Sequence, residues 1–289
     1  MAVPSSDVLE AFGIVDDPIP LPEGRGICYR AGDIILKPSD NNEEAEWISS
    51  LTESLFKRQP SVYRVSCPKE VLGGSTQRFV YSNWTAWSVI SGKTASKDAF
   101  EAILVASHEL HTDLATLRPK KPPFLSQIEN RWMEADRVTW DEKRLEDVGN
   151  VNADVLALIQ PFLQRLWQMK KPILEGMKDQ LIHGDMTGNV LFDHNRETPP
   201  GIIDITPYWR PAQFAEAIVV ADGLVWHSRG RELVDVYGTG NMRLQLLVRA
   251  LYWRCLTFAI DSDVEWVREH LPHANFNMAL TIVTNLLEI

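Results

Sequence analysis

Apolar residues in the first part of the chain fall in short runs separated by turn-forming residues. Residues 34–37, Ile-Ile-Leu-Lys, form a compact apolar run between two turns, which is typical of a strand. The period then changes, because the apolar positions Ile48, Leu51 and Leu55 have helical spacing. The pattern up to about residue 91 therefore predicts one helix among strands, with further strands at 69–72, 77–81 and 85–90.

The second part of the chain has a mainly helical pattern. Residues 98–117 carry apolar side chains along one face, as an amphipathic helix does. Two short apolar runs, at 190–192 and 201–205, predict a pair of strands within this helical part. Because strands and helices are segregated rather than alternating, the pattern predicts an α+β fold with a β-rich part at 1–91 and a larger helical part at 92–289. Further helices are predicted at 152–169, 172–180, 213–228, 241–261, 263–270 and 276–288.

The strongest chemical signal is a polar loop between two apolar strands. The sequence reads Leu-Ile-His-Gly-Asp-Met-Thr-Gly-Asn-Val-Leu-Phe, with His183, Asp185 and Asn189 in the loop. A second apolar strand, Gly-Ile-Ile-Asp, ends in the carboxylate of Asp204. Two strands joined by a short turn can bring Asp185, Asn189 and Asp204 to one edge.

Phosphoryl transfer needs this set of side chains. One carboxylate orients the attacking hydroxyl and accepts its proton, while a second carboxylate and an amide oxygen hold Mg²⁺. Each residue taken alone is more often structural, as part of a turn or a cap. The joint pattern of strand, His-Gly-Asp, Asn, strand and terminal Asp favours the catalytic interpretation.

Charge and cysteine content narrow the function classes. The net charge of −10 argues against general binding of nucleic acid, which usually needs a basic surface, but not against binding one nucleotide. The three cysteines are far apart and lack the spacing of a metal site. No apolar run approaches the ~20 residues of a membrane span, and the first residues do not resemble a signal peptide. We therefore expect a cytoplasmic protein with no membrane partner.

The His-Gly-Asp loop and the strand ending in Asp204 resemble the aminoglycoside phosphotransferase and choline-kinase-like family. A closer resemblance, to an actinobacterial-type branch of that family, is carried by Tyr-Arg-Ala-Gly-Asp-Ile-Ile-Leu-Lys-Pro at 29–38 and by the loop at 183–192. The resemblance implies a two-lobed, protein-kinase-like fold that uses ATP and Mg²⁺. It also implies that Asp185 is the catalytic base, and that Asn189 and Asp204 are the metal ligands.

One feature of the loop departs from the family pattern. Only three residues separate Asp185 from Asn189, whereas the family usually has four. Gly188 can compensate by taking a backbone conformation that other residues avoid. The assignment of Asn189 as a ligand is therefore weaker than that of Asp204.

Lys37 ends the apolar run at 34–37, where a kinase-like fold places the lysine that contacts the nucleotide phosphates. The alternative is a solvated lysine at a strand end. Its expected partner is one of Glu43, Glu44 and Glu46. Helical geometry favours Glu44, which shares a face with the apolar positions of the predicted helix.

Other nucleotide contacts are predicted less sharply. Gly24 and Gly26 form an incomplete glycine-rich turn that can cover the phosphates. Residues 87–92, with Ile90, resemble the family's hinge, where backbone groups meet adenine. His111 has the position of a packed histidine within a helix rather than that of a catalyst.

The favoured function is an ATP- and Mg²⁺-dependent phosphotransferase acting on a hydroxyl group of a small molecule. A non-catalytic kinase-like protein, serving as a nucleotide sensor or scaffold, is the alternative suggested by the short loop and the incomplete glycine turn. Phosphorylation of an aminoglycoside is a third, weaker possibility, since an acidic surface attracts cationic sugars. The substrate pocket is expected within 118–170 and the C-terminal helices, and the sequence does not indicate an oligomeric state.

Overall fold

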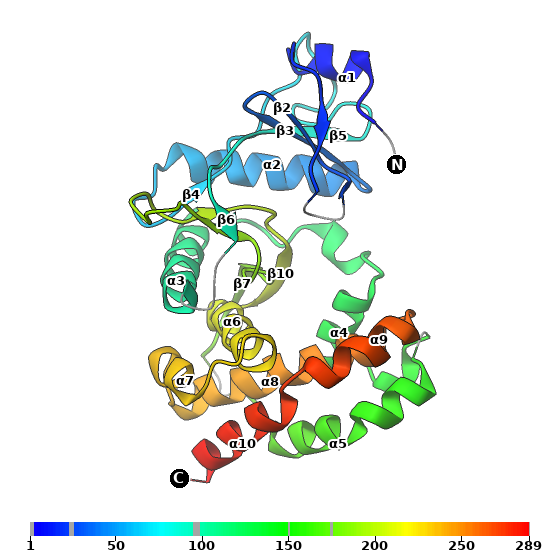
Figure 1. Cartoon of the computed structure of the whole chain (residues 1–289), viewed down its shortest axis with the longest axis vertical. Coiled ribbons are helices and arrows are strands. Elements are labelled where there is room, and N and C mark those ends of the chain that lie inside the picture. The colour runs from blue at the N-terminus through cyan, green and yellow to red at the C-terminus, as the bar shows by residue number, and fades with distance from the viewer. Residues whose placement is uncertain (1–2, 23–25, 95–98, 150, 174–175, 289) are drawn as a thin grey trace. The chain divides into compact units, whose positions relative to one another are not determined.

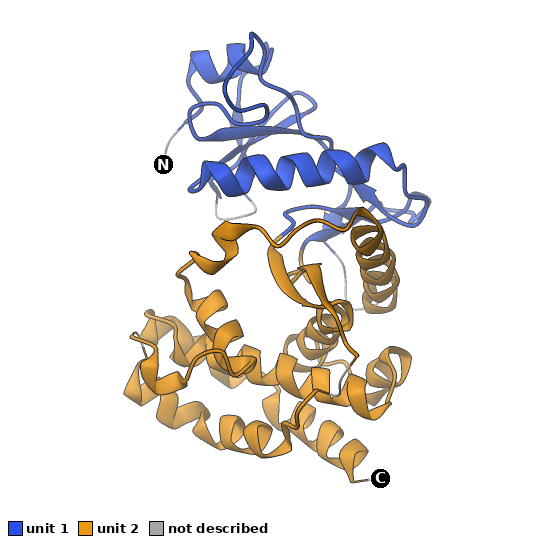
Figure 2. Cartoon of the chain, turned by 180° about the vertical axis from the view of Figure 1, so that it is seen from behind, with its two compact units in different colours: residues 1–94, 189–205 blue, residues 95–188, 206–289 orange. Residues whose placement is uncertain are grey.

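The computed structural model describes residues 3–22, 26–94, 99–149, 151–173 and 176–288. These residues group into two compact units (Figure 2). The first, here the N-terminal unit, comprises residues 1–94 and 189–205, and the second, here the helical unit, comprises residues 95–188 and 206–289. The predicted division of function between 1–91 and 92–289 stays a prediction. By its contacts, however, the segment 189–205 groups with the N-terminal residues.

The N-terminal unit contains a four-stranded antiparallel sheet (Figure 1). Its core contains Phe12, Tyr29, Leu36 and Trp84, and Leu36 is completely buried. This burial explains why the apolar run at 34–37 becomes a strand. The strand order is β1–β2–β3–β5, with β1 (Ile19–Pro20), β2 (Tyr29–Ala31), β3 (Ile34–Pro38) and β5 (Trp84–Ser88), and helix α1 (Ser6–Ala11) packs nearby.

Helix α2 (Asn42–Lys57) confirms the helix predicted from the spacing of Ile48, Leu51 and Leu55. It begins at Asn41, whose side-chain oxygen accepts hydrogen bonds from the backbone N–H groups of Glu43 and Glu44 at 3.0 and 3.2 Å. Such a cap satisfies donors that the first helical turn otherwise leaves open.

A second sheet explains why residues 189–205 group with the N-terminal unit. Strand β9 pairs in parallel with β4 and antiparallel with β8, and β8 pairs antiparallel with β6. The two strands predicted after the polar loop are therefore confirmed as a hairpin. The strands are β4 (Arg64–Val65), β6 (Lys93–Thr94), β8 (Val190–Phe192) and β9 (Gly201–Ile202).

The helical unit is built around two helices that are buried along almost their whole length, α6 and α8. Both are apolar on most sides, which is typical of helices at the centre of a domain. A two-stranded antiparallel sheet of β7 and β10 lies in the same unit. The elements are α3 (Phe100–Leu117), α4 (Arg131–Thr139), α5 (Ala153–Met169), β7 (Asp179–His183), β10 (Pro207–Pro211), α6 (Ala212–Trp226), α7 (Arg231–Tyr237), α8 (Asn241–Ala259), α9 (Val264–His270) and α10 (Phe276–Leu287), with short 3-10 turns at Pro123–Ser126, Leu145–Asp147 and Leu271–His273.

Three sequence predictions of local structure are wrong. Residues 69–72 and 77–81 belong to no strand: a turn begins at Leu72, where Gly73 and Gly74 both have φ of +81°, and the carboxylate of Glu46 binds the backbone N–H groups at 78 and 79. The helix predicted at 172–180 is absent from the described part of that range, which instead leads into β7.

The fold class is confirmed as α+β, with strands concentrated in one unit and helices in the other. No described helix combines the length and the apolar character that a membrane span needs.

Candidate functional site

Lys37 and Asp204 form an ion pair within the N-terminal unit. The Lys37 Nζ atom lies 2.6 Å from Asp204 Oδ1, although 167 positions separate the two residues. Lys37 is placed by β3, where it faces Thr85 of β5, and Asp204 follows β9 by two residues. Asp204 has φ of +51°, a left-handed conformation that is uncommon outside glycine and that marks many functional positions. The structure thus brings together the predicted phosphate-binding lysine and the predicted metal ligand.

Glu44 remains the best candidate among the three glutamates near Lys37. Burial raises the pKa of its carboxyl group, and the positive charge of Lys37 partly offsets this effect. Glu46 is engaged elsewhere, because its two oxygens accept the N–H groups of Arg78 and Phe79. Glu43 is exposed.

Asn189 and Asp204 lie at the same end of the β8–β9 hairpin. The backbone N–H of Ile203 donates to the carbonyl oxygen of Asn189 at 3.0 Å, so the two candidate ligands flank one hairpin end. Gly188 has φ of +90°, which supports the compensation expected for the shortened loop.

An amide and a carboxylate oxygen suit Mg²⁺, which is usually bound by one or two carboxylates together with substrate phosphates. The described residues contain no group of three or more His, Cys, Asp or Glu side chains able to form a metal cage of their own. Asn189 and Asp204 therefore fit the implied cation.

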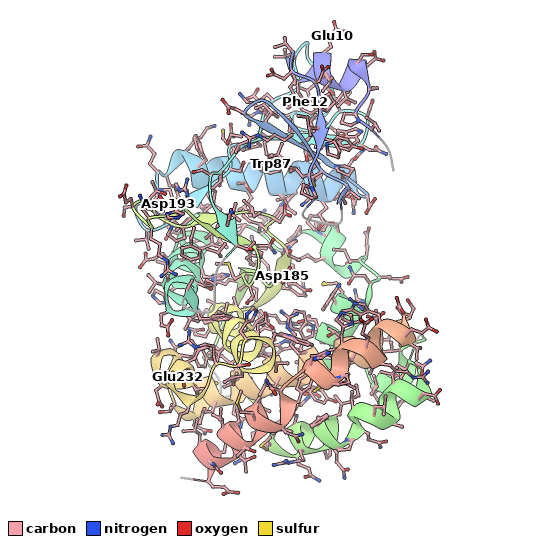
Figure 3. All side chains as sticks on the ribbon, in the orientation of Figure 1. Glu10, Phe12, Trp87, Asp185, Asp193 and Glu232 are labelled. Carbon is pink, nitrogen blue, oxygen red and sulfur yellow. The ribbon has the colours of Figure 1, made fainter. Side chains whose placement is uncertain are left out.

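Asp185 lies in the helical unit, in the loop that follows β7 (Figure 3). The ring of His183 shapes this loop, because its Nδ1 atom accepts the backbone N–H groups of Asp185 at 3.3 Å and Thr206 at 3.2 Å. His183 is completely buried. His183 therefore shapes the loop through these two hydrogen bonds. Because its Nδ1 atom accepts both of them, that atom carries no proton.

His111, on α3, binds the backbone at the start of the same loop. Its Nε2 atom accepts the backbone N–H of His183 at 3.0 Å, and its Nδ1 atom lies 2.6 Å from the carbonyl oxygen of Ser107. Burial lowers the pKa of the imidazole to about 4. His111 is thus a neutral, packed histidine, which confirms the prediction from its helical position.

Gly184 is required by a close approach of Tyr208. A Cβ atom at position 184 would lie well inside van der Waals contact with the Tyr208 ring. The backbone N–H of Gly184 also donates to the carbonyl oxygen of Thr206 at 3.0 Å. The glycine of the His-Gly-Asp motif therefore lets β7 and β10 come together beside Asp185.

The remaining predicted nucleotide contacts are partly described. Gly24 lies outside the described residues, and Gly26 has φ of +66° in the turn before β2. Ile90 packs so closely on Gly201 that a side chain at 201 would overlap it. This packing fixes the segment after β5, where the hinge is predicted.

Two residues near the candidate site were not expected from the sequence. Cys28 lies close enough to the Lys37–Asp204 pair to sense both charges, and burial raises the pKa of its thiol, with a lowering by Lys37 and a raising by Asp204. Arg254, within α8, has its Nη2 atom 4.0 Å from Asp185 Oδ1. The only sequence signal for Arg254 is a charged residue in an otherwise apolar stretch of helix.

The helical unit contains a cavity of about 460 Å³. It is lined by residues between 129 and 149 and by Ile260 and Ser262 after α8, within the ranges where a substrate pocket was predicted. Its lining contains two acidic and two basic side chains, Glu129, Glu134, Arg131 and Lys143.

No family model and no curated protein sequence matches the chain. Solved structures do match. An aminoglycoside phosphotransferase from Alicyclobacillus acidocaldarius is 13% identical with a TM-score of 0.61, covering 100% of this chain and 96% of its own. A spectinomycin phosphotransferase in complex with ADP and spectinomycin is 15% identical with a TM-score of 0.58, covering 98% and 97%.

The chain has the fold of the aminoglycoside phosphotransferases. A thermostable mutant of another aminoglycoside phosphotransferase agrees, with 14% identity, a TM-score of 0.52 and coverage of 96% of this chain and 97% of its own. The likeness extends over almost the whole chain, so it includes both units. The predicted kinase-like fold is confirmed, and the actinobacterial-type branch stays a prediction.

Proposed function

We propose that the protein is an ATP- and Mg²⁺-dependent phosphotransferase that acts on a hydroxyl group of a small molecule. The observation that carries the proposal is the Lys37–Asp204 ion pair at 2.6 Å, in a chain with the fold of small-molecule phosphotransferases. In a nucleotide-free protein, each of these side chains serves as the counterion of the other. Bound nucleotide and cation would replace both partners at once.

The proposed roles follow the chemistry of each side chain. Asp185 orients the acceptor hydroxyl and takes its proton, the hydroxyl oxygen bonds to the γ-phosphorus, and the bond from that phosphorus to ADP breaks. When bound, Mg²⁺ neutralises charge on the phosphates. Lys37, oriented by Glu44, contacts the phosphates, Asn189 and Asp204 hold the cation, Gly24 and Gly26 cover the phosphates, and the segment at Ile90 meets adenine.

Nucleotide binding is tested by thermal unfolding with and without ATP and Mg²⁺. A ligand that binds only the folded state stabilises it by about 2.7 kcal/mol at a hundred times its Kd. We expect a shift that requires both ATP and Mg²⁺, that is lost in Asp204→Asn and that persists in Asp185→Asn. No shift in the wild-type protein would contradict the proposal.

Turnover is tested by ADP release in a panel of hydroxylated metabolites and aminoglycosides. The expected result is ADP release with at least one acceptor, lowered to a small residual rate by Asp185→Asn while the thermal shift with MgATP remains. Full turnover by Asp185→Asn would show that Asp185 is not the base.

A non-catalytic kinase-like protein is the second candidate, favoured by the spacing of three residues between Asp185 and Asn189. The two candidates differ in a simple way. Nucleotide-dependent stabilisation with no ADP release from any acceptor supports the sensor or scaffold, whereas release that depends on Asp185 supports the enzyme.

We place the acceptor in the cavity of the helical unit, within the residue ranges where the sequence predicts a substrate pocket. Its two acidic side chains are balanced by two basic ones, and Glu134 already pairs with Lys143 at 2.5 Å. A polycationic aminoglycoside would gain little from such a lining, so we place a neutral or zwitterionic hydroxylated molecule first. A cytoplasmic location is part of the same proposal, because ATP must be available.

A further inference from the structure

Arg254 is a buried cation whose guanidinium is fixed by a carboxylate from a neighbouring helix. Its Nε atom lies 2.6 Å from Asp222 Oδ1, and its Nη2 atom lies 2.7 Å from Asp222 Oδ2. Asp222 belongs to α6 and Arg254 to α8, and both are less than a tenth exposed. A two-point contact of this kind fixes the plane of the guanidinium as well as its position.

The same guanidinium also lies over two aromatic rings. The Arg254 Cζ atom lies 4.4 Å from the ring centroid of Trp253 and 5.9 Å from that of Trp132. The Trp253 ring in turn meets the edge of Tyr208, the residue that packs on Gly184. Arg254 is therefore held in one place relative to the loop that carries Asp185.

The third contact of Arg254 is with Asp185 itself. The Nη2–Oδ1 distance of 4.0 Å is too long for a hydrogen bond but short enough for a strong attraction between opposite charges. The Asp185 side chain is 47% exposed. Its oxygens thus remain accessible to an acceptor hydroxyl while a fixed cation lies behind them.

Arg254 keeps its charge despite its burial. Burial lowers the pKa of the guanidinium, but the charge of Asp222, its hydrogen bonds and the charge of Asp185 together raise it above its ordinary value. One buried cation is therefore shared by two carboxylates, of which one is buried and hydrogen-bonded and the other faces solvent.

We propose that Arg254 is a positioning residue for Asp185, which holds the carboxylate toward the acceptor hydroxyl during phosphoryl transfer. The inference rests on the proposed function, in which Asp185 takes the proton of the hydroxyl. Asp222 anchors Arg254, and Arg254 restrains Asp185. A displacement of about 1 Å in a catalytic group can lower the rate about a hundredfold, so the restraint has a measurable effect.

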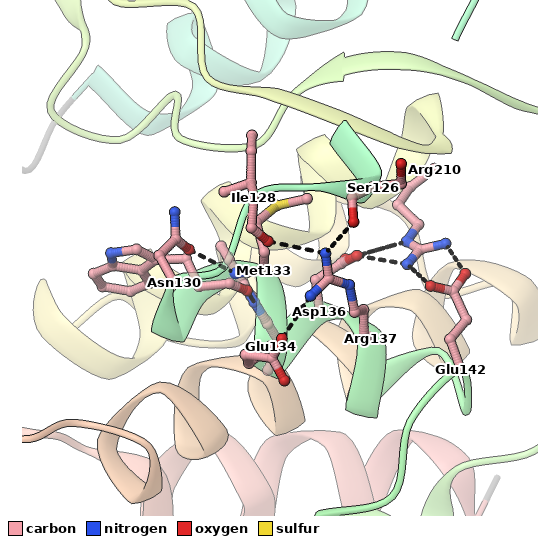
Figure 4. Close-up of polar contacts among 11 residues, drawn as sticks. Ser126, Ile128, Asn130, Met133, Glu134, Asp136, Arg137, Glu142 and Arg210 are labelled. Carbon is pink, nitrogen blue, oxygen red and sulfur yellow. Dashed lines mark hydrogen bonds and ion pairs between the residues drawn. The ribbon is translucent and has the colours of Figure 1, made fainter. Parts of the chain in front are cut away.

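A matched control exists in the same unit. Arg210 is also buried and is bound to Asp136 through its Nε and Nη2 atoms, at 3.1 and 2.5 Å, with Glu142 as a further partner (Figure 4). Its ion-pair partners among the described residues, Asp136 and Glu142, both lie outside the Asp185 loop. Arg210→Lys therefore reports the loss of a buried two-point ion pair without loss of the Asp185 contact.

The experiment compares wild type, Arg254→Lys, Arg210→Lys, Asp185→Asn and the double variant Asp185→Asn/Arg254→Lys. Lysine keeps the charge but cannot bind Asp222 at two points. The assay is ADP release from MgATP, with the best acceptor of the panel and with water alone. Thermal shifts with MgATP are measured for every variant, and Asp222→Asn serves as a second variant in case Arg254→Lys does not fold.

We expect Arg254→Lys to lower kcat about 10- to 100-fold while KM for ATP changes less than about twofold. Arg210→Lys should lower thermal stability to a similar degree without this fall in kcat. In the Asp185→Asn background, Arg254→Lys should lower the rate no further, since residues that act as one unit are not additive.

The outcomes separate the two proposals. If Asp185→Asn keeps wild-type turnover, the proposed function is wrong, and this inference falls with it. If Asp185→Asn keeps only a small residual rate but Arg254→Lys and Arg210→Lys have equal kcat, Arg254 is only structural and this inference alone is overturned. A further loss of rate in the double variant would also overturn it.

Discussion

Replacing His111 by glutamine is expected to remove a large part of the acid sensitivity of the folded state. The ring is 2% exposed. Its Nε2 atom accepts from His183, so the proton sits on Nδ1, facing the carbonyl oxygen of Ser107. Glutamine offers one acceptor and one donor of its own and can replace both hydrogen bonds, but it does not titrate.

The magnitude follows from the pKa of His111. Burial, opposed by the hydrogen bond to Ser107 and the charge of Glu216 and aided by the charge of His108, lowers the pKa from 6.5 to about 4 in the folded protein. As the pH falls, His111 therefore becomes protonated near pH 6.5 in the unfolded chain but only near pH 4 in the folded protein. The contribution of neutral His111 to the free energy of unfolding is complete above pH 6.5 and is lost as the pH falls toward 4. With 1.36 kcal/mol per pKa unit, the loss is about 3 kcal/mol.

The assay is urea unfolding followed by tryptophan fluorescence at a series of pH values between about 7 and 4.5. The carboxylates titrate in both proteins, so the difference between wild type and His111→Gln isolates the histidine. The free energy of unfolding should fall about 2 kcal/mol more in the wild type over this range. Parallel curves for the two proteins would refute the assignment of His111 as a buried neutral ring.

Three further results are expected. Gly184→Ala should cost about 1–3 kcal/mol in urea unfolding, because the new methyl group overlaps the Tyr208 ring; an unchanged midpoint would contradict this packing. Gly188→Ala meets no atom within 4 Å, yet its φ of +90° should make alanine destabilising by about 1–3 kcal/mol; equal stability would show that the loop can change its backbone. Lys37→Met should change the free energy of unfolding by less than about 1 kcal/mol, since its ion pair with Asp204 is exposed, but should abolish the thermal shift with MgATP; a retained shift would remove Lys37 from the nucleotide site.

The sequence predicted the parts of the fold that local pattern determines. The hairpin of β8 and β9 and the helices α2, α5 and α8 follow from apolar runs and helical spacing, and the structure contains all of them. Strand β10 was missed because it begins and ends with proline, Pro207 and Pro211. It is tolerated because a two-stranded sheet has only edge strands.

The candidate site was predictable only where one motif carries it. Lys37 and Asp204 are 167 positions apart in the sequence, and each was predicted from its own strand, although their contact was not. Arg254 could not be predicted as a neighbour of Asp185, because the contact depends on how α8 packs in the helical unit. The expectation that Asp185, Asn189 and Asp204 share one edge stays a prediction.

The hydrogen bonds around His183 also bear on how this protein could be modified. Hydrogen bonds join Gly184 to Thr206 and Thr206 to His183, and they close the loop of residues 184–206 at its base. The entropy of closing this loop is therefore already lost in the folded state. Because each doubling of loop length adds only about 0.6 kcal/mol, the turn between β8 and β9 should accept inserted residues. Asp193, which accepts hydrogen bonds from Glu197 and Thr198, marks where this turn begins (Figure 3). A fluorescent label or peptide tag inserted after Thr198 would lie at the end of the hairpin opposite the candidate metal ligands, and it would leave the base of the loop intact.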